Sequence, residues 1–231
     1  MNLAAQKTLA SNGGRRRDYI TVEPEHYGVK YDSKRRFCSY WHQIHEVLSL
    51  NPSHVVEIGV GGGFVSSYLK AKGGRVTTVD IDGRLRPDVT GSVLELPLAA
   101  ESCDVALCSQ VLEHLAYSDF GKALEEMSRI TRRYIVLSLP DVGRVCRVHL
   151  ELPRYVRIKA MLSLPRFRKP GSKSRRVSLH HWEIGQDRYP MRRIRCDIEE
   201  AGLRILRTYR VYETPLHRMF ILEKTGRPRD A

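Results

Sequence analysis

The chain has 231 residues, 42 % of them hydrophobic, and a formal net charge of +13. This length favours one domain, and the apolar fraction is sufficient for one sizeable core. No stretch approaches the roughly 18 apolar residues that a membrane span needs. The first residues lack the apolar run of a secretory signal peptide. We therefore expect a soluble, cytoplasmic protein rather than a membrane-spanning or secreted one.

The cysteines do not form a pattern of their own. There are five, widely scattered and without a C-x-x-C pair: Cys38, Cys103, Cys108, Cys146 and Cys196. A disulfide framework or a structural zinc site would need paired, closer spacing. We expect buried, reduced thiols and no metal site.

The positive charge is concentrated in one segment. Ser53–Asp141 holds nine Lys/Arg and twelve Asp/Glu, whereas Val142–His180 holds eleven Lys/Arg and one acidic residue. A basic segment raises the local concentration of anionic partners. Nucleic acid, an anionic membrane surface and a phosphorylated small molecule all meet this description, and charge alone does not choose among them.

The ends of the chain differ in character. Residues 1–22 are polar and include three consecutive arginines, so we predict a mobile basic tail there. Residues 23–231 are predicted to form a single domain with a basic insertion at about 142–180. Within the insertion, Tyr155, Ile158 and Leu162 form a modest apolar stripe, and Arg166–Lys173 is expected to be a mobile basic loop.

The domain is predicted to begin with an amphipathic helix. Asp32-Ser33 supplies an N-cap, and Asn51-Pro52 ends the pattern. Apolar residues recur between them at three- and four-residue spacing: Phe37, Tyr40, Trp41, Ile44, Val47 and Leu48.

Strands and helices then alternate along the chain, which predicts parallel βαβ units covered on both faces. We expect strands at residues 55–58, 76–79, 105–108 and 134–138, helices at 64–72, 120–130 and 191–201, and a weak helix with a short strand between 84 and 98. Two further strands, at 205–212 and 219–222, are separated only by a short turn at Pro215. Such neighbours must pair antiparallel.

The first strand and its helix are joined by a glycine-rich loop, Glu57-Ile58-Gly59-Val60-Gly61-Gly62-Gly63-Phe64. Glycine is needed where the backbone turns sharply and a ligand must lie against it. A dinucleotide-binding loop has the pattern G-x-G-x-x-G, and here Phe64 stands at its last position. The pattern acid-x-Gly-x-Gly-x-Gly resembles instead the first motif of class I methyltransferases.

A second motif follows the next strand. Asp80 lies 17 residues after Gly63, at the strand end, where a carboxylate can accept hydrogen bonds from both hydroxyls of a ribose. The alternative is a simple turn residue, because Asp82-Gly83 follows directly. The glycine loop at the appropriate distance favours the ribose role.

Further motifs come in order. Gly91-Ser92-Val93-Leu94-Glu95-Leu96-Pro97 precedes Ser102-Cys103-Asp104-Val105, and Cys108-Ser109-Gln110-Val111-Leu112-Glu113-His114-Leu115 comes next. The series resembles "GD-x-x-x-LP…FD-x-V…VLEH" of the small-molecule methyltransferases related to quinone-biosynthesis enzymes, and it extends from Val55 to Pro140. The resemblance implies S-adenosyl-L-methionine as cofactor. It also implies a Rossmann-like, doubly wound, seven-stranded α/β sheet, mostly parallel with an antiparallel C-terminal hairpin and helices on both faces.

The same resemblance assigns the cofactor-binding residues. Ser92 departs from the family, which usually has an aspartate that accepts from the adenine amino group, and a neutral hydroxyl is a weaker acceptor. The backbone N–H of Val93 can still meet the ring, and Gln110 should lie beside the methionine end. The predicted set is Glu57, Gly59, Gly61, Gly63, Asp80, Ile81, Ser92, Val93 and Gln110.

Methyl transfer from a sulfonium needs alignment, and a hydroxyl nucleophile also benefits from a base. His114, His180 and His181 are the candidates. The alternative for His114 is a structural role in its Leu-Glu-His turn. His180 and His181 resemble the "H-x-x-x-F" position at the active-site mouth. The alternative is that Trp182 packs in the core while both histidines cap the next helix.

The acceptor remains open at this level. The segment around His180–Glu183 and the stretch Tyr212–Arg218 resemble, loosely, methyltransferases found with bacterial surface-polysaccharide pathways. This favours a hydroxyl of a small molecule or saccharide, with phosphorylated acceptors included. An RNA 2′-hydroxyl methyltransferase is the second reading, because of the basic segment. A non-catalytic cofactor-fold binding subunit is the third, and Phe64 disfavours an NAD-dependent enzyme. The sequence does not indicate an oligomeric state.

Overall fold

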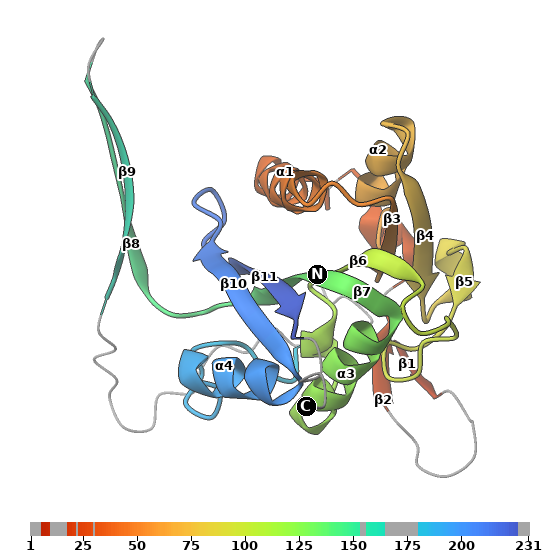
Figure 1. Cartoon of the computed structure of the whole chain (residues 1–231). Helices are drawn as coiled ribbons and strands as arrows, with labels where there is room; N and C mark the ends of the chain where they lie inside the picture. The colour runs from red at the N-terminus through yellow and green to blue at the C-terminus, as the bar shows by residue number, and fades with distance from the viewer. Residues whose placement is uncertain are drawn as a thin grey trace, which may run out of the picture.

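The computed structural model describes residues 6–9, 18–21, 23–29, 31–152, 156–164 and 180–225. Its centre is a seven-stranded sheet with helices on both faces (Figure 1). In sheet order the strands are β10 (Leu203–Arg210), β11 (His217–Lys224), β7 (Thr131–Pro140), β6 (Cys103–Ser109), β3 (His54–Ile58), β4 (Arg75–Asp80) and β5 (Val89–Thr90).

Five consecutive strands of this sheet, from β7 to β5, pair in parallel. The last strand, β11, is antiparallel to both of its neighbours, β7 and β10. The predicted fold class is therefore confirmed: a Rossmann-like sheet that is mostly parallel and ends in an antiparallel hairpin.

Within the described ranges, four α-helices cover the sheet. Helices α1 (Lys34–Ser49) and α2 (Phe64–Ala71) lie on one face, and α3 (Phe120–Ile130) and α4 (Met191–Glu200) lie on the other (Figure 1). Of the predicted pair Asp32-Ser33, Ser33 is the N-cap of α1, since its hydroxyl accepts a hydrogen bond from the backbone N–H of Arg36 at 3.4 Å.

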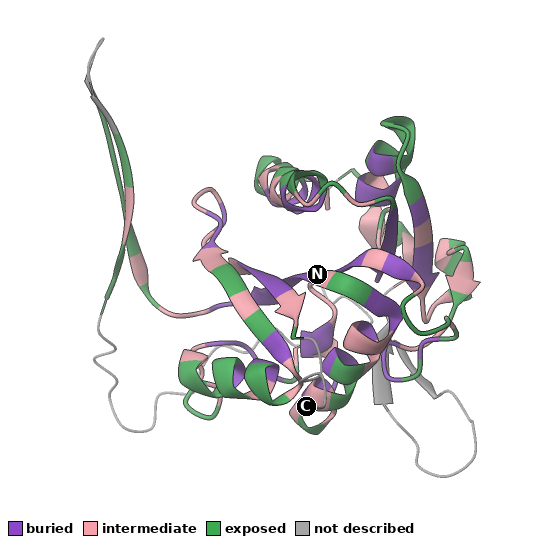
Figure 2. Cartoon of the chain, viewed as in Figure 1, coloured by how far each residue is buried: buried purple, intermediate pink, exposed green. Residues whose placement is uncertain are grey.

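The two-residue period of the strands divides the core between these helix layers. Val105 and Leu107 pack with α1 and α2, whereas Ala106 and Cys108 pack with α3 and α4. All four side chains are buried because the central parallel strands are covered on both faces. Figure 2 shows this purple core between outer helix faces that are mostly exposed.

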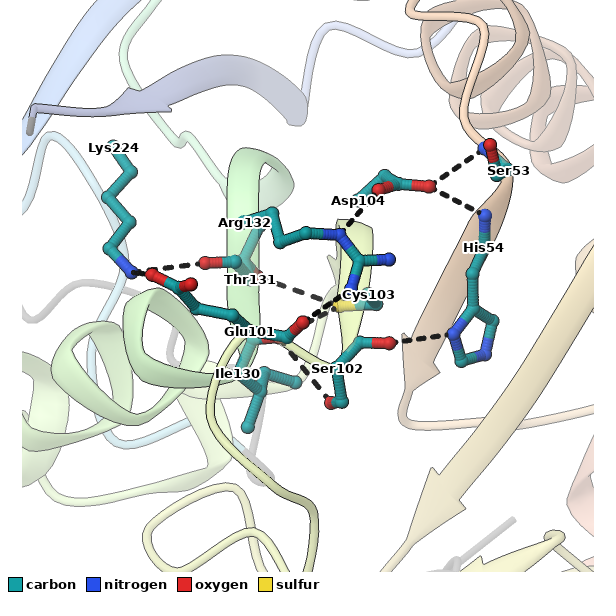
Figure 3. Close-up of polar contacts among 10 residues, drawn as sticks. All are labelled: Ser53, His54, Glu101, Ser102, Cys103, Asp104, Ile130, Thr131, Arg132 and Lys224. Carbon is teal, nitrogen blue, oxygen red and sulfur yellow. Dashed lines mark hydrogen bonds and ion pairs between the residues drawn. The ribbon is translucent and has the colours of Figure 1, made fainter.

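Polar contacts fix the strand ends opposite the carboxyl edge (Figure 3). The Asp104 carboxylate accepts hydrogen bonds from the backbone N–H groups of Ser53 and His54, at 2.8 and 2.9 Å. Arg132, on β7, donates to the same carboxylate at 2.8 Å. One side chain of β6 thus holds β3 and β7 in register with its own strand.

The N-terminal segment contains two short strands, β1 (Gln6–Leu9) and β2 (Asp18–Thr21), which pair antiparallel outside the main sheet. A mobile tail was expected over residues 1–22; residues 1–5, 10–17 and 22 lie outside the described part of the chain.

The basic insertion contains a hairpin that sequence reasoning did not predict. Strands β8 (Val145–Leu152) and β9 (Val156–Ser163) pair antiparallel as a separate two-stranded sheet. The expected basic loop Arg166–Lys173 and Tyr155 lie outside the described residues. No helix in the described ranges is long and apolar enough to span a membrane.

All five cysteines are free thiols, in agreement with the expectation of reduced cysteines. The expectation that they are buried is correct only for Cys103 and Cys108, because Cys38 is half-buried and Cys146 on β8 and Cys196 on α4 are exposed. Both lie on faces of their elements that no other part of the described chain covers.

Candidate cofactor cleft and histidine cluster

A cleft opens at the carboxyl ends of β3, β4 and β6, where a parallel α/β sheet places its ligands. The structure brings the whole predicted cofactor set to this cleft. Its lining includes Glu57, Gly59, Gly61, Gly63, Asp80, Ile81, Ser92, Val93 and Gln110.

The glycine loop has a backbone that few other residues could adopt. Gly59 has φ +82°, and a Cβ built on it would lie 2.3 Å from Cγ2 of Val111. Gly63 has φ +69° and is the N-cap of α2. The loop therefore needs glycine for its conformation and for the close approach of the β6 loop.

Asp80 joins two loops at the cleft. Its carboxylate accepts hydrogen bonds from the backbone N–H groups of Val60 and Asp82, at 2.8 and 2.9 Å. Burial raises the pKa of this carboxyl, and these hydrogen bonds oppose the rise. A carboxylate has about four acceptor positions, so acceptor capacity remains for a ligand.

Glu57, at the end of β3, is buried and has an oxygen, Oε2, without a hydrogen-bond partner among the described residues. Burial raises the pKa of Glu57 to about 7. A buried carboxylate oxygen that faces no donor is costly unless a ligand or water satisfies it.

Ser92 and Gln110 stand on opposite sides of the cleft. The Ser92 hydroxyl accepts a hydrogen bond from the backbone N–H of Leu94 at 3.2 Å. Gln110 has a left-handed backbone, with φ +56°, and its side-chain amide donates to the hydroxyl of Ser138 at 2.9 Å. This bond fixes the Gln110 side chain against β7.

Sequence reasoning missed one wall of the cleft. It comes from the segment before α1 and from α1 itself, and consists of Tyr27, Tyr31, Arg36, Tyr40 and Gln43. The guanidinium of Arg36 lies over the Tyr31 ring, 4.1 Å from its centroid. The ring of Tyr27 lies 3.3 Å from a Cβ built on Gly61, so it packs directly on the glycine loop.

A signal for this wall was present in the sequence. Arg36, Tyr40 and Gln43 recur at four- and three-residue spacing, which places them on one face of α1. From the sequence, Tyr40 was interpreted only as part of the apolar helix pattern, and Arg36 and Gln43 were not considered.

The structure brings two of the three predicted histidines together. His114 lines the cleft, and its ring contacts that of His180 edge-on with centroids 5.1 Å apart. Nδ1 of His180 is 2.8 Å from Oε1 of Glu183. Glu113 lies beside them, fully buried, and neither of its carboxylate oxygens has a hydrogen-bond partner among the described residues.

The charges in this cluster are coupled. Burial lowers the pKa of His180, but the hydrogen bond to Glu183 and the nearby Glu113 carboxylate outweigh it, and the net pKa is raised. The hydrogen bond from His180 lowers the pKa of Glu183. Burial raises the pKa of Glu113 to about 7.

His181 and Trp182 point elsewhere. His181 is exposed, and only its backbone N–H reaches the cluster, by donating to the carbonyl oxygen of Glu113 at 2.8 Å. Trp182 is completely buried and packs edge-on against Tyr117 and Phe120. Trp182 therefore packs in the core, as the alternative interpretation proposed. The other part of that interpretation was wrong for His180, because α4 begins at Met191 and its N-cap is Pro190.

Three side chains of the cluster also have the spacing of a cation site. One ligand atom each from Glu113, His114 and His180 lies within 4.8 Å of the others. The sequence predicted no metal, and that stays a prediction. The contact of Glu183 with Nδ1 fixes the His180 ring, an arrangement that also suits a proton-accepting histidine.

Comparison with known proteins assigns the central part of the chain. Residues 56–134 match the sequence profile of a family described as methyltransferase domain. These residues therefore form a methyltransferase domain within the chain. The matched residues span β3 to the middle of β7 and include every predicted cofactor-binding residue. The search of curated proteins found no match.

Solved structures share the fold of this methyltransferase domain over most of their length. A 1,6-didemethyltoxoflavin-N1-methyltransferase from Burkholderia thailandensis is 16 % identical with TM-score 0.55, covering 94 % of this chain and 98 % of its own. It holds 1,6-didemethyltoxoflavin and S-adenosylhomocysteine. A SAM-dependent methyltransferase from Aquifex aeolicus is 17 % identical with TM-score 0.54, covering 89 % and 100 %. Another, from Clostridium acetobutylicum, is 9 % identical with TM-score 0.56, covering 87 % and 96 %.

Proposed function

We propose that this protein transfers a methyl group from S-adenosylmethionine to a hydroxyl group of a small, anionic acceptor, which can be a saccharide or another ring compound. The observation that carries the proposal is the His180–Glu183 pair, because the His180 ring contacts His114, which lines the cleft. A histidine whose Nδ1 is held by a carboxylate presents Nε2 as a base, which is what a hydroxyl nucleophile needs.

The cleft fits the cofactor in three respects. Gly59, Gly61 and Gly63 leave backbone that a ligand can lie against. Asp80 has acceptor positions left for a ribose, and the partnerless Oε2 of Glu57 suits the ammonium group of a methionine. The bound cofactor would supply an activated methyl group on sulfur.

The residues of the chain would then do three things. The glycine loop and Gln110 would orient the donor end, and alignment alone can contribute on the order of 7–11 kcal/mol. Nε2 of His180 would accept the proton of the acceptor hydroxyl. Glu183 would hold the ring in the required tautomer and stabilise the resulting imidazolium.

Arg36 and the tyrosines beside it define the acceptor class. The described residues contain no carboxylate in an ion pair with the Arg36 guanidinium, which lies in the cleft against Tyr31. An anionic group on the acceptor would complete this site. Tyr27 and Tyr40 provide further aromatic faces for a ring. The Burkholderia relative, whose acceptor is a small molecule, supports the same size class.

The adjacent histidines provide a matched test. His180→Gln removes the base but keeps a polar side chain, so we expect kcat to fall about 10²- to 10⁴-fold. His181→Gln changes an exposed neighbour and should leave kcat unchanged. The assay follows transfer of radioactive methyl to a panel of hydroxylated carboxylates, sugar phosphates and RNA, using whichever acceptor is methylated.

Two results would contradict the proposal. One is RNA as the preferred acceptor, and the other is equal loss of kcat in both histidine variants. A His180→Gln protein that binds S-adenosylhomocysteine normally, measured by calorimetry, would show that any loss lies in the chemical step rather than in folding.

A further inference from the structure

The β8–β9 hairpin has two chemically different faces. The strands pair in register, with Cys146 opposite Leu162, Val148 opposite Ala160 and Leu150 opposite Ile158. Because side chains alternate along a strand, these three pairs lie on the same face. The other face carries Arg147, His149 and Glu151 on β8, and Lys159 and Met161 on β9.

The apolar face is open to solvent. Val148, Leu150, Ile158 and Leu162 are 39 %, 46 %, 47 % and 55 % exposed. Figure 1 shows the hairpin standing apart from the seven-stranded sheet, and Figure 2 shows that it is exposed along most of its length. A contiguous apolar surface of this kind on a soluble domain marks an interaction site.

The polar face is turned toward the domain. Arg147 donates hydrogen bonds to the backbone carbonyls of Tyr212 and Glu213, at 3.1 and 3.3 Å. Lys159 pairs with the Glu213 carboxylate at 3.5 Å and also lies over the Tyr212 ring. These contacts direct the opposite, apolar face away from the body of the protein.

We propose that this apolar face docks the protein on an anionic lipid membrane. An aliphatic face backed by a polar face with basic side chains, here Arg147 and Lys159, is the pattern of elements that lie in the membrane interface. The segment Val142–His180, which contains the hairpin, holds eleven Lys/Arg and one acidic residue, so anionic headgroups attract it. Neither the apolar face nor this charge is needed for methyl transfer, so the inference is independent of the proposed function.

The same features disfavour two other occupants. A second copy of the chain would bring two strongly basic segments together, and their charges repel. Single-stranded nucleic acid is bound largely through stacking on aromatic side chains, and β8 and β9 contain no Phe, Tyr or Trp. An apolar face of aliphatic side chains suits acyl chains.

Vesicle co-sedimentation of the full chain tests the proposal. Vesicles of phosphatidylcholine alone are compared with vesicles that contain about one-quarter phosphatidylglycerol, because the anionic lipid is expected to be required. The double variant Leu150→Gln, Ile158→Gln should bind the anionic vesicles at least about tenfold more weakly, since two aliphatic side chains are lost from the interface. High salt should also weaken binding by the unchanged protein.

The matched control is Leu206→Gln, Leu216→Gln, which makes the same change at two side chains that are 45 % and 59 % exposed outside the hairpin. It should bind as the unchanged protein does. The proposal is overturned if the unchanged protein sediments with neither vesicle, or if the hairpin variant binds as tightly as the control. It is also overturned if size-exclusion chromatography shows a dimer that the hairpin variant loses. Equal melting temperatures would show that both variants are folded.

Discussion

At the scale of single residues, the pairing of His180 with Glu183 distinguishes the candidate base from its neighbours. From the sequence, His180 and His181 were equally good candidates for the base. In the structure, His180 contacts the buried Glu183 carboxylate, whereas His181 is exposed to solvent. No pattern in the sequence separates them, because the difference depends on how the loop before α4 meets η3 (Leu112–His114). By contrast, Asp80 and the glycines could be placed from sequence, since each follows directly from a strand end.

The pH dependence of the reaction follows from this pairing. A base acts when deprotonated, so kcat/KM should rise with pH through the raised pKa of His180, with a midpoint above the ordinary 6.5. Glu183→Gln removes the main charge partner and should move the midpoint to lower pH. Three other groups face the His180 ring and are the same in the variant: Glu113 and His217 interact with it electrostatically, and His114 contacts it edge-on. Initial rates between pH 5 and 9, with EDTA present, measure both midpoints. An unchanged midpoint would rule out His180 as the base.

At the scale of elements, the predicted helices and central strands were correct to within a few residues. Helix α3 has the expected bounds, whereas β7 extends from Thr131 to Pro140 rather than over 134–138 alone. The ends of β7 were not predicted because its pairing with β6 and β11 continues beyond the apolar residues that marked the strand in the sequence. The β8–β9 hairpin was missed because its alternating face is not covered by a core, and its apolar residues were interpreted as a stripe.

The glycine loop is the element whose backbone can be tested most directly. Gly59→Ala places a Cβ 2.3 Å from Val111 at positive φ, so we expect a loss of about 1–3 kcal/mol of unfolding free energy and loss of cofactor binding. Gly121→Ala is the control, because nothing lies within 4 Å of its Cβ in α3. It should stabilise the protein by about 0.5–1 kcal/mol. Chemical denaturation measures the unfolding free energy of both variants. Equal changes in the two would show that the loop does not require glycine at position 59.

At the scale of the whole molecule, the fold presents three distinct features: the cleft, its aromatic wall and the β8–β9 hairpin. The carboxyl edge of the sheet carries the cleft, the segment before α1 supplies its aromatic wall, and the hairpin extends from the end of β7. The cleft could be predicted because its motifs are local to strand ends. The wall and the hairpin depend on how distant segments pack, so the basic charge indicated an anionic partner without indicating where it would be bound.

The central claim is that the cleft binds S-adenosylmethionine through Asp80. Thermal unfolding with S-adenosylmethionine, S-adenosylhomocysteine and NAD tests it on the unchanged protein and on Asp80→Asn, which keeps one carbonyl acceptor for the loop. A ligand at 100 times its Kd adds about 2.7 kcal/mol, which corresponds to roughly 5–10 °C here. We predict such a shift with both methionine compounds, none with NAD, and its loss in the variant. A folded protein that shifts with neither methionine compound, or that shifts with NAD, would contradict the account.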